Sequence, residues 1–309
     1  MRVAAIDCGT NSIRLLIADV VDSTVTDIVR TMIIVRLGEG VDKTREFSPE
    51  ALKRTFAAVD EYAELIQSHQ PEVIRFVATS ASRDVSNRDD FFAGVKSRLG
   101  IEPSVISGNE EARLSFLGAT SGLAHSSDAP KPPYLVVDIG GGSTEFVVGT
   151  REPSASISMD IGCVRMTERH LQSDPPTAEQ ITAATKDIDS AITIAGEHVD
   201  LASANSLIGV AGSVTTIAAL ALQLPEYDST KIHGAKVSAA QVQNITSQLL
   251  AMPRNERAQL GPMHEGRVDV IGGGALVLNR ILQATGLPEV TVSEHDILDG
   301  IALDLAKQA

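Results

Sequence analysis

The sequence has little of what several classes of protein require. Its two cysteines, Cys8 and Cys163, are too few for a disulfide framework or a thiolate zinc site. It has no Trp and only 3% aromatic residues, so it lacks platforms on which single-stranded bases would stack. Its net charge of −14 argues against a broad basic face for nucleic acid. We therefore expect no nucleic-acid partner, and any anionic ligand has to be held locally.

Long hydrophobic runs are also missing. The first apolar stretch is interrupted by Asp7 and Arg14, and no signal-peptide cleavage pattern follows it, so we interpret it as a strand. The longest apolar region, 207–222, is broken by Gly, Ser and Thr and is shorter than the roughly 20 residues that span a bilayer. We expect no membrane segment, and we expect a cytoplasmic protein whose two cysteines are small buried side chains.

What the sequence does contain is a repeat. With 309 residues, 43% of them hydrophobic and 21% charged, the chain is long enough for two globular domains. Two pairs of apolar, β-branched runs each predict a hairpin, and the aspartates that end their first strands stand 138 − 7 = 131 residues apart. The first hairpin joins Arg2–Asp7 to Ser12–Val20, and the second joins Tyr134–Asp138 to Ser143–Gly149.

A third strand and then alternating helices and strands follow each hairpin. This order predicts an α/β fold of the duplicated ribonuclease-H-like, or actin-like, type, with two domains around a central cleft. We place the N-terminal domain at 1–124 and the C-terminal domain at 125–309, with the segment 124–133, rich in Ser and Pro, as a hinge. The terminal helix, 296–309, is a candidate to pack back on the first domain.

Both predicted hairpins have a glycine-containing turn directly after the aspartate. Backbone N–H groups in such a turn can face an anion, and we expect this anion to be phosphate. The alternative interpretation is that each aspartate is a structural carboxylate of its turn. This is less favoured, because the two aspartates occur at equivalent places in the repeat. The phosphate-binding candidates are Gly9, Thr10, Asn11 and Ser12 in the first turn and Gly140, Gly141, Gly142 and Ser143 in the second.

Acidic residues bracket the second turn. Asp138 precedes it and Glu145 follows it, and both are candidates to hold Mg²⁺, which prefers oxygen ligands and keeps part of its water. Mn²⁺ is the alternative metal, and Asp7 is an additional candidate ligand.

A further anion site is predicted where a strand gives way to a helix at Gly212 and Ser213. Amide groups and the positive helix end favour phosphate there, although an ordinary helix start explains the pattern equally well. The segment lacks a Lys, so it is no P-loop. The run Gly272–Gly274 leaves the same two interpretations open.

A candidate base and a candidate cation lie in the first half. Glu110 and Glu111 begin a predicted helix, whose N-terminus acidic residues stabilise, and Glu111 is the candidate that takes a proton from attacking water. Arg83, after a strand, is the preferred bidentate phosphate ligand, because Arg14 fits a solvated strand position equally well.

In this combination of segments the sequence resembles the exopolyphosphatase / guanosine pentaphosphate phosphatase family along its whole length. The resemblance implies an actin-like fold, release of terminal phosphate from inorganic polyphosphate or pppGpp, and dependence on Mg²⁺. It also implies that Glu111 is the general base, that Asp138 and Glu145 position metal and water, and that Arg83 binds phosphate. The matching segments are 7–12, 78–87, 107–113, 138–145, 209–216, 227–234, 267–278 and 293–300.

One departure and several alternatives accompany this resemblance. Longer family members carry an additional helical domain after the catalytic pair, whereas this sequence ends at Ala309, so we expect lower processivity on a long polymer. The leading hypothesis is an exopolyphosphatase, and a homodimer is compatible with it. The alternatives are a pppGpp 5′-phosphohydrolase, an ATP-using kinase of the same fold, and a non-catalytic sensor of polyphosphate or alarmone.

Overall fold

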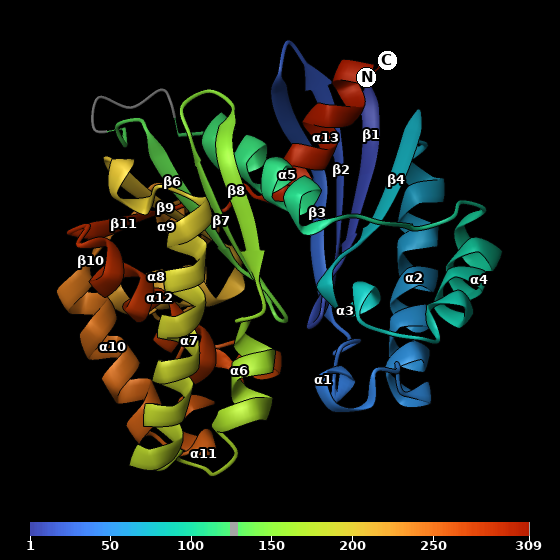
Figure 1. The fold of residues 1–309 in the computed structure, drawn as a ribbon. Coiled ribbons are helices and arrows are strands. Elements are labelled where there is room, and N and C mark those ends of the chain that lie inside the picture. Colours follow the sequence, from blue (N-terminus) through green and yellow to red (C-terminus); the bar gives the residue numbers. More distant parts are fainter. Residues whose placement is uncertain (124–128, 309) are drawn as a thin grey trace. The chain divides into compact units, whose positions relative to one another are not determined.

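The computed structural model describes residues 1–123 and 129–308, and the chain forms two compact units (Figure 1). The first unit contains Met1–Gly118 and Ile297–Ala309, and the second contains Ala119–Asp296. The boundary predicted between residues 124 and 125 falls outside the described residues, as does part of the predicted hinge. The chain changes unit at 118/119 and again at 296/297, so its last helix belongs with the N-terminal sheet.

A five-stranded sheet forms the centre of the first unit, in the order β3-β2-β1-β4-β5. β1 pairs antiparallel with β2 and parallel with β4, and β2 pairs antiparallel with β3. Its strands are β1 (Arg2–Cys8), β2 (Ser12–Val21), β3 (Thr24–Ile34), β4 (Val73–Ala78) and β5 (Ser104–Val105). Its helices are α1 (Val41–Thr44), α2 (Pro49–His69), α3 (Ser80–Arg83), α4 (Arg88–Leu99), α5 (Gly108–Ser121, which continues into the second unit) and α13 (Ile297–Gln308).

Both faces of this sheet are buried, because alternate residues of each strand enter different cores. Val3 and Ala5 of β1 pack with apolar residues of α13, whereas Ala4 and Ile6 pack in the core that α2 completes with Tyr62. Helices accordingly cover both faces of the sheet (Figure 1). The apolar side chains of α13 explain why the end of the chain belongs to this unit.

The second unit is built on a six-stranded sheet, in the order β10-β11-β9-β6-β7-β8. One main core contains the odd-numbered residues of β6 together with the inner faces of α7, α8, α10 and α12. The strands are β6 (Tyr134–Ile139), β7 (Thr144–Gly149), β8 (Pro153–Met159), β9 (Ser206–Val210), β10 (Lys236–Ser238) and β11 (Glu289–Val292). The α-helices are α6 (Cys163–His170), α7 (Ala178–His198), α8 (Ala211–Ala221), α9 (Ser229–Ile232), α10 (Ala239–Ala251), α11 (Arg254–Arg257) and α12 (Ile271–Thr285).

The duplication predicted from the sequence is confirmed by the strand order. β8-β7-β6-β9 in the second sheet repeats β3-β2-β1-β4 in the first, with the same antiparallel and parallel pairings. Helix α7 begins as predicted, where Thr177 and Gln180 form a capping box. Among the described residues, no helix is both long and apolar enough to cross a membrane.

Candidate functional site

The glycine turn between β6 and β7 is held from one side by the start of α6. Gly140 N donates to Ser143 O at 3.0 Å and closes the turn. Cys163 N donates to Gly140 O at 2.9 Å, and Val164 N donates to Gly141 O at 2.9 Å. The first amide groups of a helix have no partner inside the helix, so they are available to bind these carbonyls.

This arrangement decides where the amide groups of the turn point. In a planar trans peptide the N–H is directed opposite to the preceding C=O. The carbonyls of residues 140, 141 and 142 all accept hydrogen bonds from residues 162–165. The N–H groups of Gly141, Gly142 and Ser143 therefore point away from α6, which is the arrangement of an anion-binding nest.

Two acidic side chains lie directly opposite each other beside this turn. Asp138 of β6 pairs with Glu145 of β7, and both are buried, at 7% and 1% exposure. Glu145 Oε1 accepts hydrogen bonds from the hydroxyls of Ser143 and Ser158, each at 2.7 Å. Like charges at directly opposed positions are destabilising unless a positive charge compensates them. The pair therefore suits a cation.

The described residues contain no group of three or more His, Cys, Asp and Glu side chains that could hold a metal ion by themselves. Two carboxylates nevertheless fit Mg²⁺, because this ion is commonly bound by one or two carboxylates and completes its shell with water and substrate phosphate.

The turn between β1 and β2 is built in the same way. Gly9 N donates to Ser12 O at 2.9 Å. Gly38 N donates to Thr10 O at 2.8 Å, and Arg36 N donates to Asn11 O at 2.8 Å, so the segment after β3 holds the carbonyls here. The N–H groups of Asn11 and Ser12 consequently point away from that segment.

The acid of the first hairpin has a basic residue opposite it. Asp7 pairs in register with Arg14, and Asp7 Oδ2 accepts from Arg14 Nη2 at 2.6 Å and from Arg14 Nε at 3.0 Å. Arg14 is 19% exposed and Asp7 is 6% exposed at the side chain. The solvated interpretation of Arg14 was therefore wrong, because the guanidinium serves as the partner of a buried carboxylate.

Glu111 and Arg83, predicted separately as base and phosphate ligand, form an ion pair. Arg83 Nη1 donates to Glu111 Oε2 at 2.7 Å and to Ile106 O at 3.1 Å. Glu111 is 8% exposed at the start of α5, and the guanidinium holds its carboxylate in one orientation. The neighbouring Glu110 instead binds Arg75 at 2.5 Å. The two adjacent glutamates thus have separate cationic partners.

A further candidate anion site lies at the start of α8. Ala211 has a left-handed backbone (φ 71°), and Gly212 follows it. The guanidinium of Arg267 lies against Gly212, where an added Cβ would come within 2.2 Å of Nη2, and Arg267 Nη1 donates to Thr216 Oγ1 at 3.2 Å. A helix N-terminus beside a guanidinium favours an anion. Arg267 was not among the predicted site residues.

The run Gly272–Gly274 has a packing role. These residues are buried inside α12, where a Cβ on Gly273 would lie 2.7 Å from Cys163 O and one on Gly274 would lie 2.2 Å from Ser213 Oγ. The missing side chains let α12 approach α6 and α8. Burial raises the pKa of the Cys163 thiol, so this buried cysteine stays protonated.

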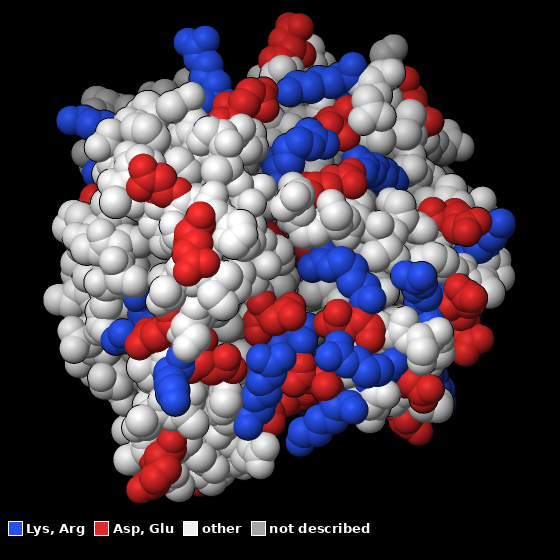
Figure 2. Space-filling view, viewed as in Figure 1, with Lys and Arg blue, Asp and Glu red and all other residues white. Residues whose placement is uncertain are grey.

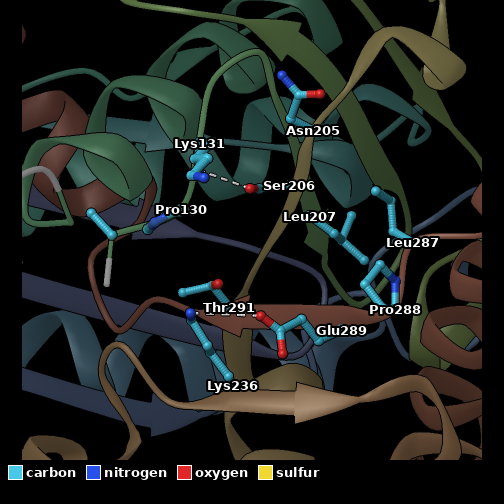
Figure 3. A pocket seen from close by; sticks show the side chains of 11 residues that line it. Pro130, Lys131, Asn205, Ser206, Leu207, Lys236, Leu287, Pro288, Glu289 and Thr291 are labelled. Carbon is cyan, nitrogen blue, oxygen red and sulfur yellow. Dashed lines mark hydrogen bonds and ion pairs between the residues drawn. The ribbon is translucent and has the colours of Figure 1, made fainter. Parts of the chain in front are cut away.

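A cavity of about 200 Å³ lies beside the N-terminal ends of β9 and β11 (Figure 3). Its lining includes Lys131, Lys236 and Glu289, and none of the predicted site residues. On the visible face of the molecule, basic and acidic side chains are intermixed (Figure 2). This face shows no broad basic patch for an anionic polymer.

Three comparisons with known proteins identify related chains. The sequence profile of the Ppx/GppA phosphatase family matches residues 16–309. Exopolyphosphatase 2 of Mycobacterium tuberculosis is 49% identical over 318 residues, which cover 99% of this chain and 98% of that protein. Guanosine-5′-triphosphate,3′-diphosphate pyrophosphatase of Photobacterium profundum is 28% identical over 98% of this chain and 59% of its own length. A crystal structure of an exopolyphosphatase-like protein superposes with a TM-score of 0.95 at 45% identity, covering 99% of this chain and 98% of its own.

Proposed function

The chain belongs to the Ppx/GppA phosphatase family, whose members are hydrolases, and from this premise we propose that it is an exopolyphosphatase. The proposed reaction removes the terminal phosphate of inorganic polyphosphate. The observation that carries the proposal is the nest of amide groups at 141–143 beside the opposed acids Asp138 and Glu145. Identity of 49% to an exopolyphosphatase over nearly the full length of both chains supports the same substrate.

The amide groups are proposed to bind the non-bridging oxygens of the terminal phosphates. Gly141, Gly142 and Ser143 supply one set, and Asn11 and Ser12 supply another. The start of α8, with Gly212, Ser213 and Arg267, offers a further place for phosphate in the second unit.

Asp138 and Glu145 would hold Mg²⁺. When bound, the ion offsets the negative charge of the phosphates. The hydroxyls of Ser143 and Ser158 fix the carboxylate of Glu145 for this role. Asp7 is left out of the proposed metal ligands, because Arg14 already neutralises its charge.

Glu111 is the proposed general base. Its carboxylate takes a proton from water as the water oxygen attacks the terminal phosphorus, and the bond from phosphorus to the bridging oxygen breaks. Orthophosphate and the shortened chain leave. The ion pair with Arg83 holds Glu111 in one orientation. Within the described residues, Arg83 Nε and Nη2 have no protein acceptor, so they are offered to a phosphate oxygen.

Two adjacent glutamates provide the test of this role. Glu111→Gln is expected to lower the rate of phosphate release from polyphosphate by about 10²- to 10⁴-fold, the usual contribution of a general base, with the fold retained. The matched control is Glu110→Gln, which changes a residue bound to Arg75 and is expected to keep near-normal turnover. Near-normal turnover of Glu111→Gln would refute the assigned base.

The choice of substrate is tested on the unchanged protein. Phosphate release is measured side by side on polyphosphates of several lengths, pppGpp and ATP, in Mg²⁺ and in Mn²⁺. The proposal expects polyphosphate to have the highest kcat/KM. A preference for pppGpp would favour the second candidate function, which the similarity to the Photobacterium profundum enzyme supports at 28% identity. Tight binding without turnover would indicate a sensor, and phosphoryl transfer from ATP would indicate a kinase.

A further inference from the structure

Arg165 is a buried arginine that holds the glycine turn twice. It lies on α6, is 6% exposed, and its Nε donates to Gly142 O at 2.8 Å within the protein interior. Its own backbone N donates to Gly141 O at 3.1 Å. Its Nη2 also lies 3.7 Å from Asp160 Oδ1. One residue therefore binds two successive carbonyls of the turn.

This contact acts on the amide group of Ser143. The carbonyl of Gly142 and the N–H of Ser143 belong to one planar peptide and point in opposite directions. When Arg165 fixes the carbonyl, it fixes the direction of that N–H as well. A charged donor on the carbonyl also polarises the peptide, and a polarised N–H is a stronger donor to an anion.

Glycine makes this support necessary. Gly140, Gly141 and Gly142 have no side chains that would restrict the turn, so unsupported peptides there have many accessible conformations. Gly162 N also donates to Gly142 O, at 3.2 Å, which is longer than the contact from Arg165. Of the two donors to Gly142 O, Arg165 thus makes the shorter hydrogen bond and is the charged one.

We propose that Arg165 is a positioning residue for phosphate binding: it orients and polarises the Gly142–Ser143 peptide, so that the Ser143 amide binds a phosphate oxygen of the substrate. This inference rests on the proposed function, since it names the residue that prepares the anion-binding turn. It assigns Arg165 no direct contact with substrate.

Three variants test it, with tripolyphosphate as the probe. Arg165→Met removes the donor at similar length, Arg165→Lys keeps the charge, and Arg169→Met is the matched control on the same helix. Arg169 faces Asp187, at 3.5 Å. We expect Arg165→Met to raise KM for tripolyphosphate about tenfold to a hundredfold, because a misplaced binding group can cost up to about a hundredfold. Arg165→Lys should recover part of this loss, and Arg169→Met should change KM less than about twofold.

The ratio of KM to kcat separates positioning from mere stability. A residue that only supports the fold lowers the amount of active protein, so apparent kcat falls with the folded fraction seen by circular dichroism while KM stays constant. An unchanged KM in Arg165→Met would overturn the proposal. If Arg165→Met does not fold, an unchanged KM in Arg165→Lys together with unchanged tripolyphosphate affinity overturns it.

Direct binding separates this inference from the proposed function. Calorimetry with tripolyphosphate, on the wild-type chain and on Arg165→Met, reports binding whether or not hydrolysis occurs. Wild-type binding without phosphate release would overturn the proposed hydrolysis, and weaker binding by Arg165→Met would still support the positioning role. A wild-type chain that neither binds nor hydrolyses tripolyphosphate would overturn both.

Discussion

The two hairpins of this protein share one backbone plan and differ in the charge of a single position. In each, a glycine N–H closes the turn onto a serine carbonyl, and the residue seven positions after the aspartate lies opposite it (14 − 7 and 145 − 138). That residue is Arg14 in the first hairpin and Glu145 in the second. The first aspartate is thus neutralised by its own hairpin, whereas the second faces another acid. The two repeats share one scaffold, and one change of charge separates an Asp–Arg ion pair from the pair of acids that we propose to bind a cation.

A second difference concerns the glycine that follows the third strand of each repeat. A Cβ on Gly38 would meet the methyl group of Thr10 at 2.3 Å, whereas a Cβ on Gly162 would meet the backbone carbonyl carbon and oxygen of Gly141 at 2.3 Å. The first obstacle is a side chain, and the second is backbone of the glycine turn itself. The second repeat therefore tolerates less change.

The largest expected effect separates the two aspartates by activity. Asp138→Asn should lower kcat for phosphate release about a thousandfold, or about 4 kcal/mol, because a group that stabilises transition-state charge is lost. Its melting temperature should change little, because Asn has nearly the same shape as Asp. Phosphate-release kinetics and thermal unfolding measure the two quantities. Loss of folding in this variant, or activity within a few fold of wild type, would contradict the assignment of a cation-binding pair.

The same substitution in the first hairpin should act on stability. Asp7→Asn leaves the largely buried Arg14 without its carboxylate, so the free energy of unfolding should fall by about 3 kcal/mol. Urea unfolding measures this change, and kcat per folded molecule should fall far less than in Asp138→Asn. The control is Asp19→Asn, which breaks the exposed Arg2–Asp19 pair between the same two strands and should have little effect. If Asp7→Asn lost activity and kept its stability, the contrast between the hairpins would be wrong.

Substitution of the two equivalent glycines sharpens the second difference. Gly162→Ala should lower the free energy of unfolding by about 2 kcal/mol or more and also raise KM, because backbone of the anion-binding turn has to move. Gly38→Ala should cost about 1 kcal/mol, since Thr10 can give way. Urea unfolding and steady-state kinetics on the same preparations compare them. Equal losses in the two variants would show that the obstacle at Gly162 relaxes as easily as a side chain does.

Much of the fold could be predicted because it depends on local patterns. Strand alternation, the two aspartate–glycine turns and the capping box at Thr177 are readable within short windows, and they led to the duplicated α/β plan. The three-residue strand β10 was missed, because Lys236–Ser238 is too short for a periodic signal. The sequence did not decide which unit contains the last helix, because this depends on long-range packing of α13 on β1 and β2.

The contacts among the candidate site residues could be predicted only in part. The pairing of Asp7 with Arg14 could have been predicted, because residues equally far from a four-residue hairpin turn lie opposite each other. From the sequence, Arg14 was instead left open between a phosphate ligand and a solvated strand residue. Arg165 and Arg267 carry no comparable local signal. Each acts on a turn that lies more than twenty residues away in sequence, and only the folded chain brings them together.

The smallest expected effect tests the cation directly. If Asp138 and Glu145 bind Mg²⁺, the free energy of unfolding should rise by about 1.4 kcal/mol at a Mg²⁺ concentration ten times the dissociation constant, because the ion binds the folded chain and not the unfolded one. The melting temperature should then rise by about 2 °C to 4 °C. The rise should persist in Asp7→Asn, because Asp7 is not among the proposed metal ligands. It should disappear in Asp138→Asn and in Glu145→Gln. NaCl at equal ionic strength is the control for screening. If the rise persisted in both second-hairpin variants, or disappeared in Asp7→Asn, the cation would bind elsewhere. The charge at position 145 would then not explain the difference between the repeats.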